Sequence, residues 1–295
     1  MANSVSEFIK KIMGINYDDK KYIYVYRGHA DSAWKLEPNI YRKNNLQLLK
    51  NEHNMFNDCI IAKPEEFSDC RYTVDYLAKM QHYGLPTRLL DATSDPLVAL
   101  FFVVQDCNKK KDGEVICLEI PKEMVKSYSS DTVSILANTA KLKYDCSSYT
   151  IPKFVAKCHS RGQCSCSSNP NYCKARCKKF YEENESIHYL QYEINSEKPH
   201  FKKKINPVDI NSVVCVRAKL QNPRIINQSG LFLLFGIGEN NKEMPQKSSW
   251  KKHSIAIPSG QKKHILDELK RMQRSSSFVY PELPNVIEEI KSRYK

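Results

Sequence analysis

The stretch QHYGLPTRLLDATSDPLVALF, residues 81–101, decides how this chain is expected to fold. Gly84 and Pro86 predict the end of a preceding helix, and Asp95 followed by Pro96 is typical of an N-cap and a first helical residue. Between these breaks lie ionisable side chains in an otherwise apolar run, where burial is costly unless each charge is paired. We therefore expect a polar site enclosed by a hydrophobic framework in this region.

A second informative segment is YRGH, residues 26–29, which ends a run of alternating tyrosines. This alternation predicts a β-strand that ends at the glycine. Arg27 presents a rigid fork of donors that matches phosphate and ribose oxygens, and Gly28 would leave a ligand room to approach. An internal ion pair of Arg27 with Asp91 or Asp95 is the alternative explanation.

His82 and Tyr83 follow a helix predicted over residues 74–82 and precede a glycine, so we expect them at the mouth of a pocket. A neutral His there can act as an acid, a base or a hydrogen-bond donor. A ring that only caps a backbone carbonyl is an equally good explanation. Arg88 and Asp91 are three residues apart and are expected to pair with each other.

The composition is that of a folded protein, because 41% of the 295 residues are hydrophobic and can form a substantial core. No apolar run reaches the roughly 18–20 residues that a membrane span requires. The N-terminus, MANSVSEFIKKIMG, shows no secretory signal. We expect a cytoplasmic protein without a membrane partner.

The order of predicted elements favours an α+β fold in a single domain over residues 1–295, helix-rich first and strand-rich second. Helices are expected at residues 4–13, 45–62, 74–82, 96–105 and 130–138, and then at 259–271 and 281–294. Strands are expected at residues 21–27 and 113–120, and then at 187–194, 212–218, 230–237 and 254–257.

A small, basic, cysteine-rich insertion over residues 141–185 interrupts this pattern. From Lys141 to Lys179 the chain has nine Lys or Arg and one acidic residue, within a net charge of +13. Such charge suits a nucleic acid, although a solubilising surface is the simpler explanation. Four thiolates of this segment can bind structural zinc, with an unliganded loop as the alternative. The candidate ligands are Cys158, Cys164, Cys166, Cys173 and Cys177.

Several stretches resemble the FRG domain family, which is named for a Phe-Arg-Gly triplet; Tyr26 stands at the Phe position. They are YRGHADSAWKLEPNIYR (26–42), QHYGLPTRLLDATSDPLVALFF (81–102), NPRIINQSGLF (222–232), SIAIPSGQKKHILDEL (254–269) and FVYPELP (278–284). The resemblance spans about residues 22–289 and implies an FRG-type domain that carries the cysteine-rich insertion. Through the family it also suggests a role in bacterial stress or phage defence.

The aromatic-Arg-Gly strand end is also similar to the first motif of ADP-ribosyltransferases, in which an Arg or His holds NAD. This similarity implies Arg27, His82 and Gln228 as catalytic residues. The residues that it implies for NAD binding are Arg27, Gly28, His29, Tyr83, Thr93 and Ser94. Because the amide of Gln228 cannot serve as a general base, another group such as His82 or Glu239 has to activate the acceptor.

The sequence therefore predicts an NAD-dependent, ADP-ribosyltransferase-like enzyme with an unknown macromolecular acceptor, which the insertion would recruit. A non-catalytic nucleic-acid-binding module that acts through the insertion is the alternative. A nuclease-like or hydrolytic enzyme that uses His82 and Asp91 is a third hypothesis, and it requires a metal ion or a water-activating pair.

Overall fold

A computed structural model of the chain describes residues 1–107, 110–143, 185–202, 205, 210–219, 222–237 and 250–294. The cysteine-rich insertion lies almost wholly outside these residues, so its zinc site and its binding of nucleic acid stay predictions. Glu239 also lies outside the described residues. Within the described ranges, no group of three or more His, Cys, Asp or Glu side chains is placed to hold a metal ion. Over the same ranges, no helix is both long and apolar enough to cross a bilayer.

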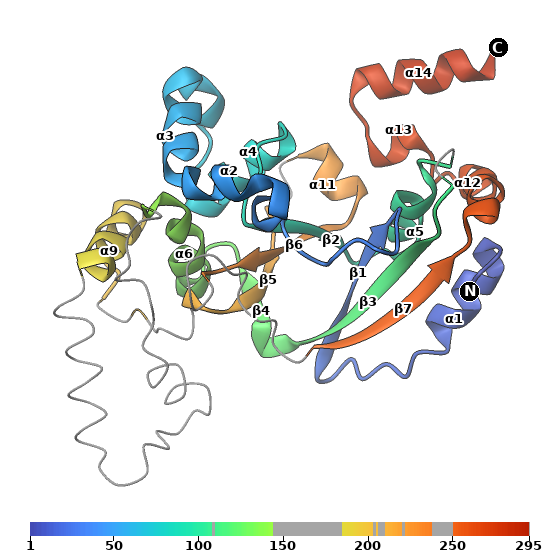
Figure 1. The fold of residues 1–295 in the computed structure, drawn as a ribbon, viewed down its shortest axis with the longest axis horizontal. Helices are drawn as coiled ribbons and strands as arrows, with labels where there is room; N and C mark the ends of the chain where they lie inside the picture. The colour runs from blue at the N-terminus through green and yellow to red at the C-terminus, as the bar shows by residue number, and fades with distance from the viewer. Residues whose placement is uncertain are drawn as a thin grey trace, which may run out of the picture.

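The described strands form one mixed sheet of seven strands in the order β4-β5-β6-β2-β1-β3-β7 (Figure 1). Their bounds are β1 Tyr22–His29, β2 Leu89–Thr93, β3 Gly113–Pro121, β4 Val125–Ser127, β5 Val213–Arg217, β6 Gly230–Phe235 and β7 Lys251–Ile257. Neighbouring strands are antiparallel except for β4 and β5, which are parallel. Strands from both halves of the sequence therefore build the same sheet.

The sheet is weakly joined in its middle, between β1 and β2. β1 pairs with β3 from Tyr22 to His29, and β2 pairs with β6 from Leu89 to Thr93. Between β1 and β2 the register contains a single pair, Tyr26 with Thr93. The strands diverge beyond it, and the halves β4-β5-β6-β2 and β1-β3-β7 run in different directions (Figure 1).

Helices cover both halves of the sheet. Their bounds are α1 Val5–Met13, α2 Leu46–Lys50, α3 Glu52–Ala62, α4 Thr73–His82, α5 Pro96–Val104, α6 Asp131–Asn138, α9 Glu185–Glu197, α11 Pro223–Asn227, α12 Lys262–Arg271, α13 Ser276–Val279 and α14 Leu283–Arg293. α1, α5 and α12 lie over the β1-β3-β7 half, and α3, α4 and α6 lie by the other half (Figure 1).

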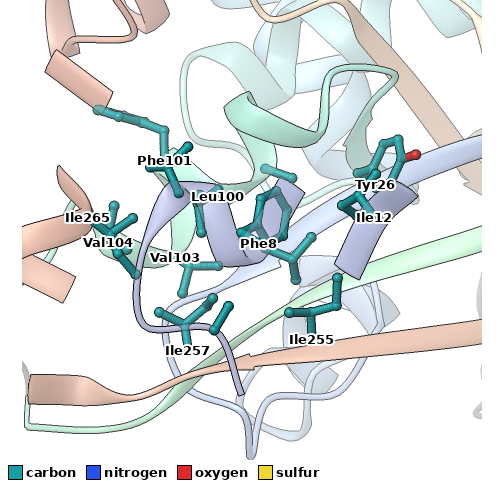
Figure 2. Close-up of a cluster of buried hydrophobic side chains, with 14 of the residues drawn as sticks. Phe8, Ile12, Tyr26, Leu100, Phe101, Val103, Val104, Ile255, Ile257 and Ile265 are labelled. Carbon is teal, nitrogen blue, oxygen red and sulfur yellow. The ribbon is translucent and has the colours of Figure 1, made fainter. Parts of the chain in front are cut away.

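The core of the β1-β3-β7 half is formed where α1, α5 and α12 meet the strands (Figure 2). Phe8 of α1, Leu100 of α5 and Ile265 of α12 are completely buried there, against Tyr26 and Ile257 of the sheet. Each fully buried aliphatic or aromatic side chain contributes about 1.5–3 kcal/mol relative to an exposed one. This core therefore fixes β1, and with it Arg27, relative to α5.

A separate core supports the other half. Leu77 of α4 and Val133 of α6 pack against Leu234 of β6, and α9 adds a further cluster around Ile194. Different helices thus pack on the two halves, while a further buried cluster that includes Val25 of β1, Leu90 of β2 and Leu233 of β6 joins the halves across the sheet.

Several sequence predictions are confirmed. The side chains of Ser4 and Asp95 accept hydrogen bonds from backbone amides and cap α1 and α5. The α+β class is confirmed as well, with helices and strands that alternate along the chain. A strict helix-rich half followed by a strand-rich half is not observed, because β1 to β4 all precede residue 128.

Two element predictions are corrected by the structure. Residues 187–194, expected as a strand, lie in α9, where the buried Ile187, Leu190 and Ile194 recur with helical spacing. β2 is a strand that the sequence pattern did not predict. Its five residues are buried except for Asp91, so they show no clear alternation, and they lie in a segment punctuated by glycine and prolines.

The guanidinium of Arg88 forms a buried ion pair with Glu52. Its Nε and one terminal nitrogen donate to the two carboxylate oxygens at 2.9 and 2.6 Å. The other terminal nitrogen donates to Tyr41 Oη at 2.8 Å and to the carbonyl of Gly236 at 3.2 Å. The predicted pairing of Arg88 with Asp91 is therefore wrong, because a buried carboxylate from a distant helix satisfies this guanidinium.

Glu52→Ala is expected to lower the free energy of unfolding by about 3–5 kcal/mol, because it leaves the Arg88 guanidinium buried without its counter-charge. Urea denaturation followed by circular dichroism measures this loss. The control Glu288→Ala removes the exposed partner of Lys291 and should change the stability by less than about 1 kcal/mol. Equal losses for the two variants would contradict the structural importance of the buried pair.

Candidate functional site

A cavity of about 590 Å³, which we call the main groove, opens where β1 and β2 diverge. Residues from β1, α4, β2, α5 and α11, and from the segment between α13 and α14, line it. Its volume is typical of small-molecule and cofactor sites. The charged residues on its wall are Arg27, Asp69, Asp75, Lys79, Asp91, Asp106, Lys219, Arg224 and Glu282.

Arg27 lies half-buried on this wall, beside the point where the strands diverge. One terminal nitrogen donates to the backbone carbonyl of Asp91, while the buried Nε has no hydrogen-bond partner among the described residues. Burial lowers the pKa of the guanidinium, and the nearby Asp91 counteracts this effect. An arginine remains charged at neutral pH. The Arg27 side chain therefore bridges the two strands and retains a donor that is not used by the described part of the chain.

Gly28 provides the close packing of α5 against β1. A Cβ atom at this position would lie 2.0 Å from the carbonyl oxygen of Ala99 and 3.0 Å from Cβ of Phe102. The space on this side of Gly28, which was expected to admit a ligand, is therefore filled by the helix. Gly28 still borders the main groove, and its contact with NAD stays a prediction.

His82 and Tyr83 line the main groove at the end of α4, as the sequence predicted. The chain turns immediately afterwards at Gly84, whose φ of 95° favours glycine. His82 is half-buried, and its ring lies edge-to-face with Tyr83 at a centroid distance of 5.0 Å. Burial lowers the pKa of His82, and the positive charge of Arg224 lowers it further. The imidazole is therefore neutral at physiological pH and can accept a proton.

Among the carboxylates on the groove wall, Asp91 and Glu282 influence the pKa of His82. Both raise the pKa of His82, which shows that they lie within electrostatic reach of the ring. Oδ1 of Asp91 accepts a hydrogen bond from Nε2 of Gln81 at 2.8 Å, so the carboxylate is oriented by α4. The groove therefore brings two of its carboxylates within electrostatic reach of a neutral imidazole.

Arg224, at the start of α11, adds a second cation to this part of the groove. Its guanidinium lies over the ring of Tyr280 at 4.7 Å, and no described carboxylate forms an ion pair with it. The amide of Arg224 donates to the side chain of Asn222, which caps the helix. The position of this cation is therefore fixed by stacking and by the cap, and its charge is available to a ligand.

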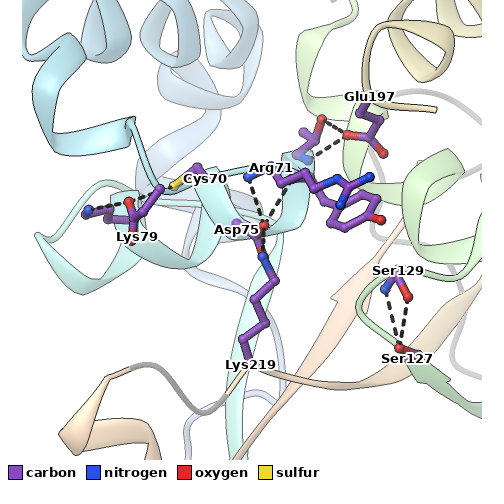
Figure 3. A network of polar contacts seen from close by, with 11 residues as sticks. Cys70, Arg71, Asp75, Lys79, Ser127, Ser129, Glu197 and Lys219 are labelled. Carbon is purple, nitrogen blue, oxygen red and sulfur yellow. Dashed lines mark hydrogen bonds and ion pairs between the residues drawn. The ribbon is translucent and has the colours of Figure 1, made fainter. Parts of the chain in front are cut away.

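Another part of the main groove is lined by lysines that are already neutralised (Figure 3). Nζ of Lys79 lies 3.0 Å from Asp69, and Nζ of Lys219 lies 2.6 Å from Asp75. Burial raises the pKa of the adjacent Cys70 thiol to about 11. Cys70 is therefore protonated at neutral pH and a weak nucleophile.

Thr93 and Gln228 border the groove and hold its wall together. The hydroxyl of Thr93 donates to the backbone carbonyl of Gln228 at 2.6 Å and accepts from the amide of Asp95 at 2.9 Å. Nε2 of Gln228 donates to the carbonyl of Val279 at 3.0 Å. The side-chain amide of Gln228, which the resemblance implied as catalytic, thus joins α11 to α13.

Ser94 and His29, both predicted to contact NAD, are not among the described residues that line the main groove. Ser94 is exposed, and its hydroxyl donates to the carbonyl of Ser229 at 3.4 Å. His29 is buried, with Nδ1 3.6 Å from Glu114 and its ring 6.2 Å from that of Trp34. Burial is the main cause that lowers the pKa of His29 to about 4.

Arg224 and Glu282 line the same groove as His82 and influence its pKa, but they were not predicted as site residues. Both lie in motifs that carry the family resemblance, NPRIINQSGLF and FVYPELP. A charged residue inside a short, mostly apolar motif was the available signal, as it was for Arg27.

Comparison with known families supports the resemblance. The family model of the FRG domain matches residues 22–112, so this part of the chain is an FRG domain. The match includes β1, β2 and α5, whereas the resembling motifs at 222–232, 254–269 and 278–284 lie beyond it. No curated protein and no solved structure matches the chain. The match therefore identifies a domain family and does not identify an activity.

The buried His29 is expected to make the protein less stable in mild acid. Its pKa of about 4 in the folded state lies below the usual value near 6.5, so the unfolded chain binds the proton more tightly. Stability should fall by up to about 3 kcal/mol as the pH drops from 6.5 to 4. His29→Asn should reduce this slope in urea denaturation at several pH values. An unchanged slope would contradict the assignment.

The electrostatic contact between His82 and Arg224 gives a further prediction. In NMR titration the pKa of His82 should lie below its ordinary value, because burial and Arg224 both disfavour the imidazolium. Arg224→Ala should move the pKa upward, whereas Arg224→Lys keeps the charge and should move it less. If the pKa of His82 is the same in Arg224→Ala as in the unchanged protein, the two residues do not share a site.

Proposed function

We propose that the main groove binds NAD as a substrate and transfers its ADP-ribose group to a macromolecular acceptor. One observation carries this proposal. Arg27, His82, Asp91, Arg224 and Glu282 come from separate segments of the sequence, yet all line a single cavity. Cations for a pyrophosphate and carboxylates for a developing positive charge are therefore available together.

Binding is supported by the two guanidinium groups. Arg27 is half-buried on the groove wall, and neither Arg27 nor Arg224 forms an ion pair with a described carboxylate. A pyrophosphate accepts charge-assisted hydrogen bonds from such groups in a bidentate manner. The cavity volume of about 590 Å³ lies within the range of known ligand sites, and the cavity borders several aromatic side chains.

The chemistry is supported by the two carboxylates. Transfer breaks the bond between C1′ of the ribose and the nicotinamide nitrogen, whose electrons return to the pyridine ring. The sugar then resembles an oxocarbenium ion, which a nearby carboxylate such as Glu282 or Asp91 stabilises. The acceptor forms the new bond to C1′ and loses a proton to the other carboxylate or to neutral His82.

This assignment changes the roles expected from the sequence. Gln228 holds α11 against α13, and the carboxylates take over the function that its amide cannot perform. Arg27 and His82 keep the proposed roles of orienting the dinucleotide and of accepting a proton. Hydrolysis, with water as the acceptor, uses the same residues and is distinguished by the product.

Glu282→Gln is expected to retain NAD binding and to lower transfer about 10²–10³-fold, because it removes a charge that acts mainly in the transition state.

Arg27→Ala is expected to weaken NAD binding at least about tenfold, with a cost of about 1 kcal/mol in stability for the lost hydrogen bond. Calorimetric titration with NAD measures binding, and labelled NAD with cell extract measures transfer.

Two matched controls accompany these variants. Glu288→Gln and Arg271→Ala alter exposed residues outside the main groove and should leave both measurements unchanged. Release of nicotinamide without labelled protein or nucleic acid would indicate hydrolysis. Failure of the unchanged protein to bind NAD would contradict the proposed function.

A further inference from the structure

A second hollow of about 390 Å³, which we call the edge groove, lies along the β4 end of the sheet. β4 is the last strand of the described sheet on this side and pairs in parallel with β5, with Lys126 beside Val216 and Ser127 beside Arg217. Lys122, from the single helical turn before β4, completes its basic wall. The edge groove thus gathers cations from two segments that are far apart in the sequence.

The charged residues among the described lining of the edge groove are all positive. Lys122, Lys126 and Arg217 line it, and no acidic residue is among the described residues on its wall. None of these three cations forms an ion pair with a described residue, in contrast to Lys79 and Lys219 of the main groove. Lys122 and Arg217 are exposed and Lys126 is half-buried. Three cations without an ionic partner among the described residues favour a ligand with several negative charges.

The edge groove borders the main groove. Tyr128 and Ala218 line both cavities. The ring of Tyr128 is held by Nζ of Lys219 at 4.9 Å and by the edge of Tyr72 at 5.6 Å. A half-buried aromatic ring with a fixed position therefore lies between the basic hollow and the candidate active site.

We infer that the edge groove binds a single-stranded nucleic acid, with phosphates on Lys122, Lys126 and Arg217 and a base near Tyr128. Proteins that bind single strands combine a cationic groove for the backbone with aromatic side chains on which bases stack. An acidic protein segment would satisfy the cations but carries no bases to stack on the tyrosine. This inference does not depend on NAD chemistry, and it places the nucleic acid on a surface other than the cysteine-rich insertion.

The inference is tested by fluorescence anisotropy of the full chain with labelled 20-residue DNA and RNA single strands over a range of salt concentrations. The variant K122A/K126A/R217A should weaken binding and reduce the slope of log K against log salt by about 2, as expected for three lost phosphate contacts. Tyr128→Leu should weaken binding about tenfold through loss of stacking, with a smaller effect on the salt slope.

A matched control removes the same charge elsewhere. Lys10, Lys11 and Lys263 are exposed on α1 and α12, so K10A/K11A/K263A should bind like the unchanged protein. Thermal melting of each variant shows whether it is folded, and the single variant Arg217→Ala provides a milder test. The relative use of DNA and RNA identifies which strand is preferred.

Four results would overturn the inference: no binding of the unchanged protein, an unchanged affinity in K122A/K126A/R217A, equal losses in the control variant, or equal binding of poly-glutamate. If the affinity is unchanged in the triple variant, the nucleic acid binds another surface, such as the insertion. None of these outcomes affects NAD binding by the main groove, so the two proposals can fail separately.

Discussion

The candidate site depends on one constraint, which is that β1 and β2 share only a single register pair. The close approach of α5 to Gly28 fixes β1 on one side, since any side chain at this position would collide with the carbonyl of Ala99. Beyond the Tyr26–Thr93 pair, the Arg27 guanidinium donates to the Asp91 carbonyl. A side chain thus supplies a hydrogen bond between the two strands where their backbone pairing ends. The same divergence leaves the space that forms the main groove.

The polar residues of this region serve three different purposes, although the sequence groups them together. Arg27, His82 and Asp91 face the main groove. Asp95 caps α5, and Arg88 forms a buried, bidentate ion pair with Glu52. Burial of such a pair gives little net stability, but it requires one arrangement of α3 relative to the start of β2. Ionic groups that are not among the described lining residues therefore help to position the elements of the groove wall.

Local signals predicted the helix caps of α1 and α5, the strand that carries Arg27 and the location of the polar site, because these features depend on neighbouring residues. They could not predict partners that are distant in the sequence. Glu52 lies 36 residues from Arg88, and Arg224 and Glu282 reach His82 only through the packing of α11 and α13. For β2, four of the five residues are buried, which removed the alternation on which strand prediction relies.

The two grooves differ in a way that bears on what each can bind. In the main groove, cations and carboxylates occur together, so a ligand must place its negative and positive parts correctly to gain from both. This favours a compact molecule whose charge changes during a reaction. In the edge groove the described lining residues carry only positive charge, which attracts a polyanion without selecting its register. Because Tyr128 borders both cavities, a polymer held by the second groove would lie beside the candidate site in the first.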